Sequence, residues 1–122
     1  MNRIAVLGFA VAIASLFLVQ APCVAQSSAH DASAYTVRIE GLTNEHRDAL
    51  QAQLKGRSDL RLVFACVPVG VLVFEPAPGE PKSSAAQRAM HLLDAQQLLS
   101  KREELTDGRA AAEAACAQAR NR

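Results

Sequence analysis

The stretch Leu60–Glu75 reads LRLVFACVPVGVLVFE and holds two apolar, β-branched runs, residues 60–67 and 69–74. Val and Phe pack well on a pleated surface, whereas a proline cannot donate a hydrogen bond to a strand ladder. Pro68 therefore separates two neighbouring strands, which we expect to form a hairpin at the centre of a small sheet.

The first strand of this pair alternates between two faces. One face carries Leu60, Leu62, Phe64 and Cys66. The opposite face begins with the charged Arg61, which marks it as the solvated one, so parity predicts that Cys66 points toward the core. The second run, Val69–Phe74, is apolar on both faces, which is typical of a strand that is flanked by neighbours or covered on both sides.

Upstream of the hairpin, residues 35–40 (YTVRIE) alternate between apolar and polar side chains. A period of two predicts a strand with one solvated face. Gly41 ends this strand, and Thr43 or Asn44 can cap a helix that continues to about Lys55. The order up to the hairpin is therefore β-α-β-β.

Downstream, residues 75–82 (EPAPGEPK) contain three prolines and predict a surface connection. Ser84 and Gln87 form a capping box for the next helix, which could run to about Glu104. Residues 109–120 (RAAAEAACAQAR) predict a short C-terminal helix by propensity, although this helix has little apolar bulk with which to dock.

The beginning of the chain has the pattern of a secretory signal. A positive start is followed by the uncharged apolar run Ile4–Val19 and then by small residues. We expect a signal peptide over residues 1–25 and a periplasmic or secreted protein; a retained membrane anchor is the alternative. A flexible lead-in, residues 26–34, then precedes a single α+β domain, residues 35–122.

Cleavage after residue 25 would remove Cys23 and leave Cys66 and Cys116, which are 116 − 66 = 50 residues apart. In an oxidising compartment such a pair invites a disulfide, which in the loop-entropy model stabilises the fold by roughly 3–4 kcal/mol. Two unpaired, buried thiols are the alternative. A bridge would attach the alanine-rich C-terminal helix to the body of the domain.

The order β-α-β-β-α, with residues 37–43 (VRIEGLT) leading into the first helix, resembles the heavy-metal-associated domain of copper chaperones and metal-transporting ATPases. The resemblance covers roughly residues 35–99 and implies a ferredoxin-like α+β sandwich, here with an extra C-terminal helix. In that family a Gly-Met-Thr-Cys-x-x-Cys loop holds a soft cation. Gly41-Leu42-Thr43 match its first positions, but Asn44 and Arg47 replace the two cysteines, and neither can act as a thiolate ligand.

Other site chemistry is sparse. Glu45, His46 and His91 are the remaining candidate zinc ligands, although lone histidines are usually ordinary surface or core residues. The sequence has no nucleophile elbow, phosphate loop, HExxH or CxxC motif. The chain after residue 25 has 13 − 1 = 12 basic and 12 acidic residues, one Tyr and no Trp, which gives nucleic-acid binding no support.

These observations predict an exported, non-enzymatic binding module that works through contacts with a protein partner. We expect no cofactor, no nucleic-acid partner and no membrane span after signal cleavage. The alternative is a periplasmic metal or redox carrier that uses Cys66 and Cys116.

Overall fold

The computed structural model describes residues 32–122. Its strands and longer helices follow in the order β1 (Tyr35–Ile39), α2 (Asn44–Leu54), β2 (Leu60–Cys66), β3 (Val71–Pro76), α3 (Lys82–Ala95), β4 (Arg102–Leu105) and α4 (Arg109–Arg120). The expected signal peptide, residues 1–25, and the first part of the lead-in, residues 26–31, lie outside the described residues.

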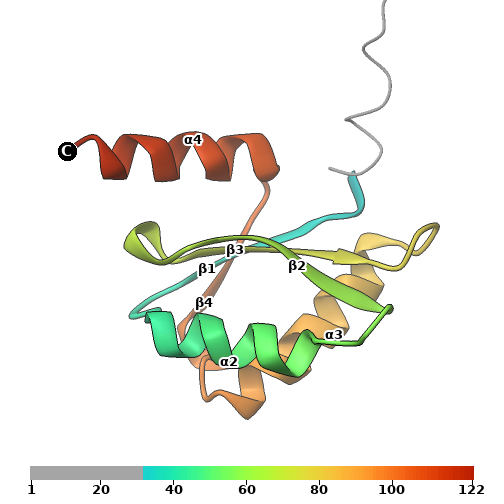
Figure 1. The fold of residues 1–122 in the computed structure, drawn as a ribbon. Coiled ribbons are helices and arrows are strands. Elements are labelled where there is room, and N and C mark those ends of the chain that lie inside the picture. The colour runs from blue at the N-terminus through green and yellow to red at the C-terminus, as the bar shows by residue number, and fades with distance from the viewer. Residues whose placement is uncertain (1–31) are drawn as a thin grey trace, which may run out of the picture.

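The four strands form one antiparallel sheet in the order β2-β3-β1-β4. Helices α2 and α3 lie on one face of this sheet, which we name the inner face, and α4 lies on the opposite, outer face (Figure 1). The strand order and the β-α-β-β-α-β succession are those of a ferredoxin-like fold with an added C-terminal helix. This confirms the fold class expected from the sequence.

The main core lies between the sheet and the helices α2 and α3. Its buried members are Tyr35, Val37, Ile39, Leu42, Leu50, Leu54, Leu60, Leu72, Phe74, Ala85, Ala89, Leu92, Leu93 and Leu98. The rings of Tyr35 and Phe74 stack with their centroids 6.5 Å apart. Each fully buried large apolar side chain contributes about 1.5–3 kcal/mol, so this cluster supplies most of the driving force for folding.

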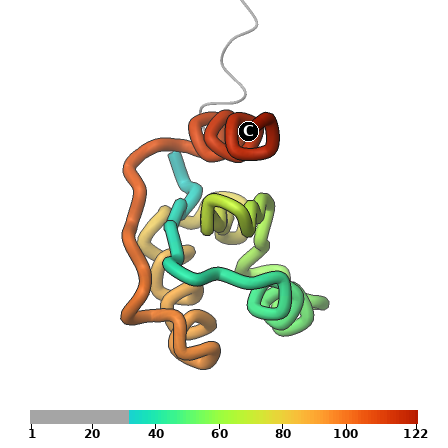
Figure 2. Tube along the Cα trace, turned by 90° about the vertical axis from the view of Figure 1, so that its left-hand side faces the viewer, coloured from blue at the N-terminus to red at the C-terminus, as the bar shows by residue number. Residues whose placement is uncertain are grey.

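A second, smaller cluster lies on the outer face under α4. It consists of Ala34, Val71, Val73 and Ala112, with Val63, Phe64, Val69 and Leu105 packed against it. Every residue of β3 is buried, which confirms that this strand is covered on both sides. Helix α4 has the predicted bounds. It lies on the opposite side of the sheet from α2 and α3 (Figure 2).

Strand β2 contains a bulge that the sequence pattern did not reveal. Its register with β3 shifts between Leu62 and Phe64, so Val63 has no partner of its own in β3. Such an extra residue moves all following side chains to the opposite face. The parity prediction for Cys66 was therefore wrong: this residue is buried under α4 on the outer face, whereas Leu62 packs into the main core.

The two inner helices begin differently. Helix α2 has the predicted cap, because the Thr43 hydroxyl accepts a hydrogen bond from the His46 backbone N–H at 3.2 Å. Helix α3 begins earlier than expected, at Lys82, and has no side-chain cap. The capping box predicted from Ser84 and Gln87 was wrong, since both residues lie inside the helix.

The prediction that the helix of α3 runs to about Glu104 was also wrong. It ends at Ala95, and Gln97 takes a positive φ of 59° that turns the chain back. Leu98 is then buried, and Arg102–Leu105 pair with β1 as the fourth strand. A charged segment can form this strand because it is an edge strand, whose side chains stay largely in solvent.

No helix within residues 32–122 is long and apolar enough to cross a membrane.

Candidate functional site

The loop between β1 and α2 holds Gly41-Leu42-Thr43, the residues that carry the resemblance to the heavy-metal-associated domain. Asn44 and Arg47, which the resemblance sets at the positions of the two cysteines, lie in the first turn of α2. The guanidinium of Arg47 lies 2.8 Å from the Asp48 carboxylate. These two positions therefore carry an amide and an ion pair, and neither residue can act as a thiolate ligand.

The three candidate zinc ligands are not brought together. The Nδ1 atom of His46 accepts a hydrogen bond from the Thr43 backbone N–H at 3.3 Å, which completes the capping box of α2. Glu45 and His91 are exposed on α2 and α3. Within residues 32–122, no group of three or more His, Cys, Asp or Glu side chains is placed to hold a metal ion.

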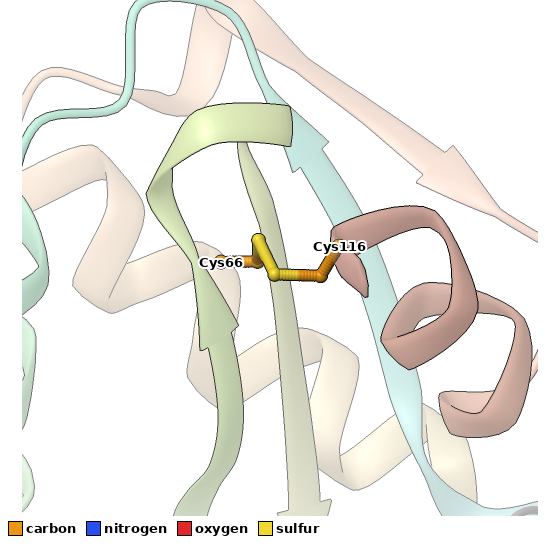
Figure 3. Close-up of a disulfide and its surroundings, with 2 residues drawn as sticks. All are labelled: Cys66 and Cys116. Carbon is orange, nitrogen blue, oxygen red and sulfur yellow. A yellow bond between two sulfur atoms is a disulfide. The ribbon is translucent and has the colours of Figure 1, made fainter. Parts of the chain in front are cut away.

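Cys66 and Cys116 form a disulfide with a Cα–Cα distance of 6.0 Å (Figure 3). It joins the last residue of β2 to the middle of α4. The two residues are only 1% and 2% exposed. An attacking thiolate must reach a sulfur atom, so exchange at this bond requires α4 to move first. This placement favours a structural staple over a redox carrier.

Strand β2 forms one of the two free edges of the described sheet, and it is more apolar than β4 at the other edge. The strand order leaves one side of β2 unpaired by any described strand. Its central residues, including Val63 and Phe64, are only partly buried. An edge strand presents backbone N–H and C=O groups to which another chain can bind.

Two hollows flank this edge on the side of α2. The first, of about 500 Å³, is lined by Gln51, Ala52, Leu54, Lys55, Leu60, Arg61 and Leu62. The second, of about 360 Å³, is lined by Arg47, Gln51, Leu62, Val63, Phe64 and Ala65. Because they share Gln51 and Leu62, we treat them as one shallow channel between α2 and the edge of β2, and we name it the β2 groove.

The β2 groove combines an apolar floor with a basic rim. Leu54 and Leu62 supply apolar surface, and no acidic side chain of residues 32–122 lines it. On the α2 side the rim carries Arg47, Gln51 and Lys55. Residues four apart on a helix lie on the same face, so these three side chains form one row along the groove.

A larger hollow of about 620 Å³ lies at the end of the sheet, between the β1–α2 loop and the two 3₁₀ turns Val67–Val69 and Leu99–Lys101. Its charged lining residues are Arg38, Glu40, Lys101, Arg102 and Glu103. Arg38 and Glu103 form an ion pair at 3.6 Å. The mixed signs select no particular ligand charge, so this hollow is a weaker candidate than the β2 groove.

An ionic cluster fixes the turn before β2. Arg57 donates two hydrogen bonds to the Asp59 carboxylate, at 2.9 and 2.8 Å. Arg88 bonds to the Glu80 carboxylate and to the Asp59 carbonyl oxygen, so the turn is tied to α3. The hydrogen bond from Arg57 is the main reason that the pKa of Asp59 falls from 3.8 to about 2. Each charge in the cluster has a partner, which indicates a structural role.

Sequence reasoning missed the β2 groove. The sequence pattern marks Arg47 only as the residue at a metal-ligand position and Lys55 only as the end of a helix. Their spacing with Gln51, on the side of α2 next to the buried Leu50 and Leu54, was a signal for a second functional face. The groove itself depends on how α2 packs over β2, which no local pattern encodes.

Comparisons with protein-family models, with curated proteins and with solved structures find no match.

Proposed function

We propose that this protein is an exported, non-enzymatic interaction module that binds an extended segment of a protein partner along the free edge of β2. One observation carries the proposal: an unpaired strand edge lies directly beside an apolar groove. This combination suits recognition by strand addition, in which backbone hydrogen bonds supply affinity and neighbouring pockets supply specificity.

The dimensions of β2 suit this role. The strand has seven residues, which corresponds to roughly 23 Å of extended chain. An added strand would pair with its backbone and would cover Val63 and Phe64, which are now partly exposed. Its side chains on the inner face would enter the groove between β2 and α2.

The disulfide supports export, because such bonds persist mainly in oxidising compartments. We propose the periplasm or the extracellular space as the site of action. We also propose a relationship to the heavy-metal-associated domain in which Asn44 and Arg47 have replaced the metal thiolates. In this view the fold serves protein contacts instead of soft-metal transfer.

Selection from a displayed library of linear peptides, followed by mapping with backbone amide chemical shifts, tests the proposal. We expect selected peptides to shift the amides of residues 60–66 and 47–55. Val63→Lys, which places a charge at the free edge, should abolish this binding. Gln118→Lys, an exposed change on α4, is the matched control and should leave it unchanged. Shifts confined to the hollow at the end of the sheet would contradict the proposal.

A further inference from the structure

We infer that the segment bound at β2 is acidic, with two carboxylate side chains four residues apart and an apolar side chain midway between them. This inference rests on the proposed strand addition at β2 and names the chemistry of its partner. It follows from the row of Arg47, Gln51 and Lys55 beside the groove.

The spacing of the row matches an extended chain. Arg47 lies on α2, and Lys55, eight residues later, is the C-cap of this helix, so the two are about 12 Å apart along a helix that rises 1.5 Å per residue. Residues four apart on a strand lie on the same face and are about 13 Å apart. Two inward side chains of an added strand would therefore align with the two cations. The side chain between them would lie near Gln51, over the apolar floor formed by Leu54 and Leu62.

The charges of the rim are available to a ligand. Lys55 has no ion pair with any residue of the described part of the chain. Arg47 pairs with Asp48 on the exposed surface of α2, and such exposed pairs are weak enough to accommodate a second carboxylate. Arg61 also lines the groove, but it donates a hydrogen bond to the nearly buried Glu75 carboxylate at 3.0 Å, so its charge is already paired.

The same row argues against a second copy as the occupant. Antiparallel pairing of β2 with its own copy would place two α2 helices side by side above the joined sheet. The basic rows of the two copies would then face each other, and like charges in such a position oppose association. An acidic segment would instead be attracted to the basic row, since each of its carboxylates would lie beside a cation.

The test compares three linear peptides that differ only at two positions. All contain the core X-Thr-Val-Thr-X, in which X is Glu, Gln or Lys. Isothermal titration calorimetry with the full chain should show that the Glu peptide binds about tenfold more tightly than the Gln peptide. The Lys peptide should bind more weakly than both. The advantage of Glu should shrink at ~0.5 M salt, because salt screens exposed charges.

Charge reversal supplies the matched variants. Arg47→Glu with Lys55→Glu should reverse the order of the peptides, so that the Lys peptide binds best. Arg120→Glu with Arg122→Glu changes the net charge by the same amount at the C-terminal end of α4 and just beyond it, and should leave the order intact. We avoid Arg61 in this test, because its loss would leave the buried Glu75 without its partner.

The outcomes separate this inference from the proposed function. Equal affinities for the three peptides, with amide shifts along β2, would overturn the acidic preference and leave strand addition standing. No binding by any of the three, together with library peptides that map elsewhere, would overturn both. A concentration-dependent dimer in sedimentation that Val63→Lys abolishes would overturn the acidic partner in favour of self-association.

Discussion

Ile39 of β1 and Gly70, in the turn between β2 and β3, are joined by a backbone hydrogen bond. The backbone N–H of Ile39 donates a hydrogen bond to the Gly70 carbonyl oxygen at 2.7 Å. A Cβ atom on Gly70 would overlap the Ile39 carbonyl oxygen, and Gly70 has a φ of +70°. Glycine alone satisfies both conditions, so this contact fixes how the hairpin sits against β1.

Gly70→Ala should therefore lower the free energy of unfolding by about 3 kcal/mol or more, through left-handed strain and a backbone clash. The control is Gly56→Ala, because Gly56 has a φ of +80° but no atom within 4 Å of its Cβ position. That change should cost only about 1–2 kcal/mol. Urea denaturation measures both, and equal losses would show that the contact with Ile39 is unimportant.

Removing the disulfide should loosen α4 selectively. The double change Cys66→Ala and Cys116→Ala should lower the free energy of unfolding by about 3–4 kcal/mol, because the covalent constraint on the unfolded chain is lost. Besides the disulfide, α4 is held by small side chains such as Ala112. Hydrogen exchange should therefore show fast amides in α4 and continued protection in β1 and β3. Unchanged protection of α4 would mean that its packing alone holds it.

The redox state of the same bond discriminates between a staple and a carrier. Because both sulfur-bearing residues are buried, we expect a mild thiol reductant to leave the native protein oxidised. Mass spectrometry after alkylation measures the fraction reduced. Rapid reduction without loss of the native fold would favour the redox-carrier alternative for Cys66 and Cys116.

The Asp59 carboxylate should make stability depend on pH in acid. Hydrogen bonds from Arg57 hold its folded-state pKa at about 2, below the ordinary value of 3.8. A group whose pKa is lowered on folding stabilises the fold above its unfolded pKa, and that contribution is lost as the pH falls from about 4 toward 2. Asp59→Asn should therefore flatten the pH dependence in this window. An NMR titration that gives an ordinary pKa for Asp59 would refute the expectation.

The hydrogen bond between Arg102 of β4 and Tyr35 of β1 should help to hold β4 against β1. The Arg102 guanidinium donates a hydrogen bond to the buried Tyr35 hydroxyl at 3.2 Å. Tyr35→Phe removes both the hydroxyl and its need for a partner, so it should cost only about 0.5–1.5 kcal/mol. Arg102→Ala should cost more, because it takes the donor away and leaves the hydroxyl behind. Thermal denaturation of both variants and of the double variant measures the coupling.

Several elements were predictable from local patterns. The period of two in residues 35–40, the Thr43 cap and the apolar hairpin each carry a strong signal, and the structure has β1, α2, β2 and β3 at those places. Strand β4 carries no such signal, because Arg102–Leu105 reads REEL and suits a helix by propensity. Its formation depends on the backbone of β1 beside it, where Thr36 pairs with Leu105 and Arg38 with Glu103.

The candidate site was less predictable, for a different reason. The disulfide partners followed from counting cysteines, but the face on which they meet depends on the bulge at Val63. The β2 groove lies between α2 and the edge of the sheet that α2 leaves uncovered. Only the packed structure shows that Arg47 and Lys55 line this groove. Sequence periodicity describes each element alone and contains no information on where α2 lies relative to the edge of β2.

The bulge at Val63 exchanges the two faces of the sheet on which the odd- and even-numbered side chains of β2 lie. Before it, even-numbered residues face the main core, and after it the odd-numbered Ala65 faces the core while Cys66 faces α4. Inserting or deleting one residue between the bulge and Cys66 would turn the thiol toward the core, out of reach of Cys116. An insertion or deletion of two residues in this part of β2 keeps Cys66 on the side of α4, whereas a change of one residue does not. We therefore expect two-residue changes to be tolerated better than one-residue changes.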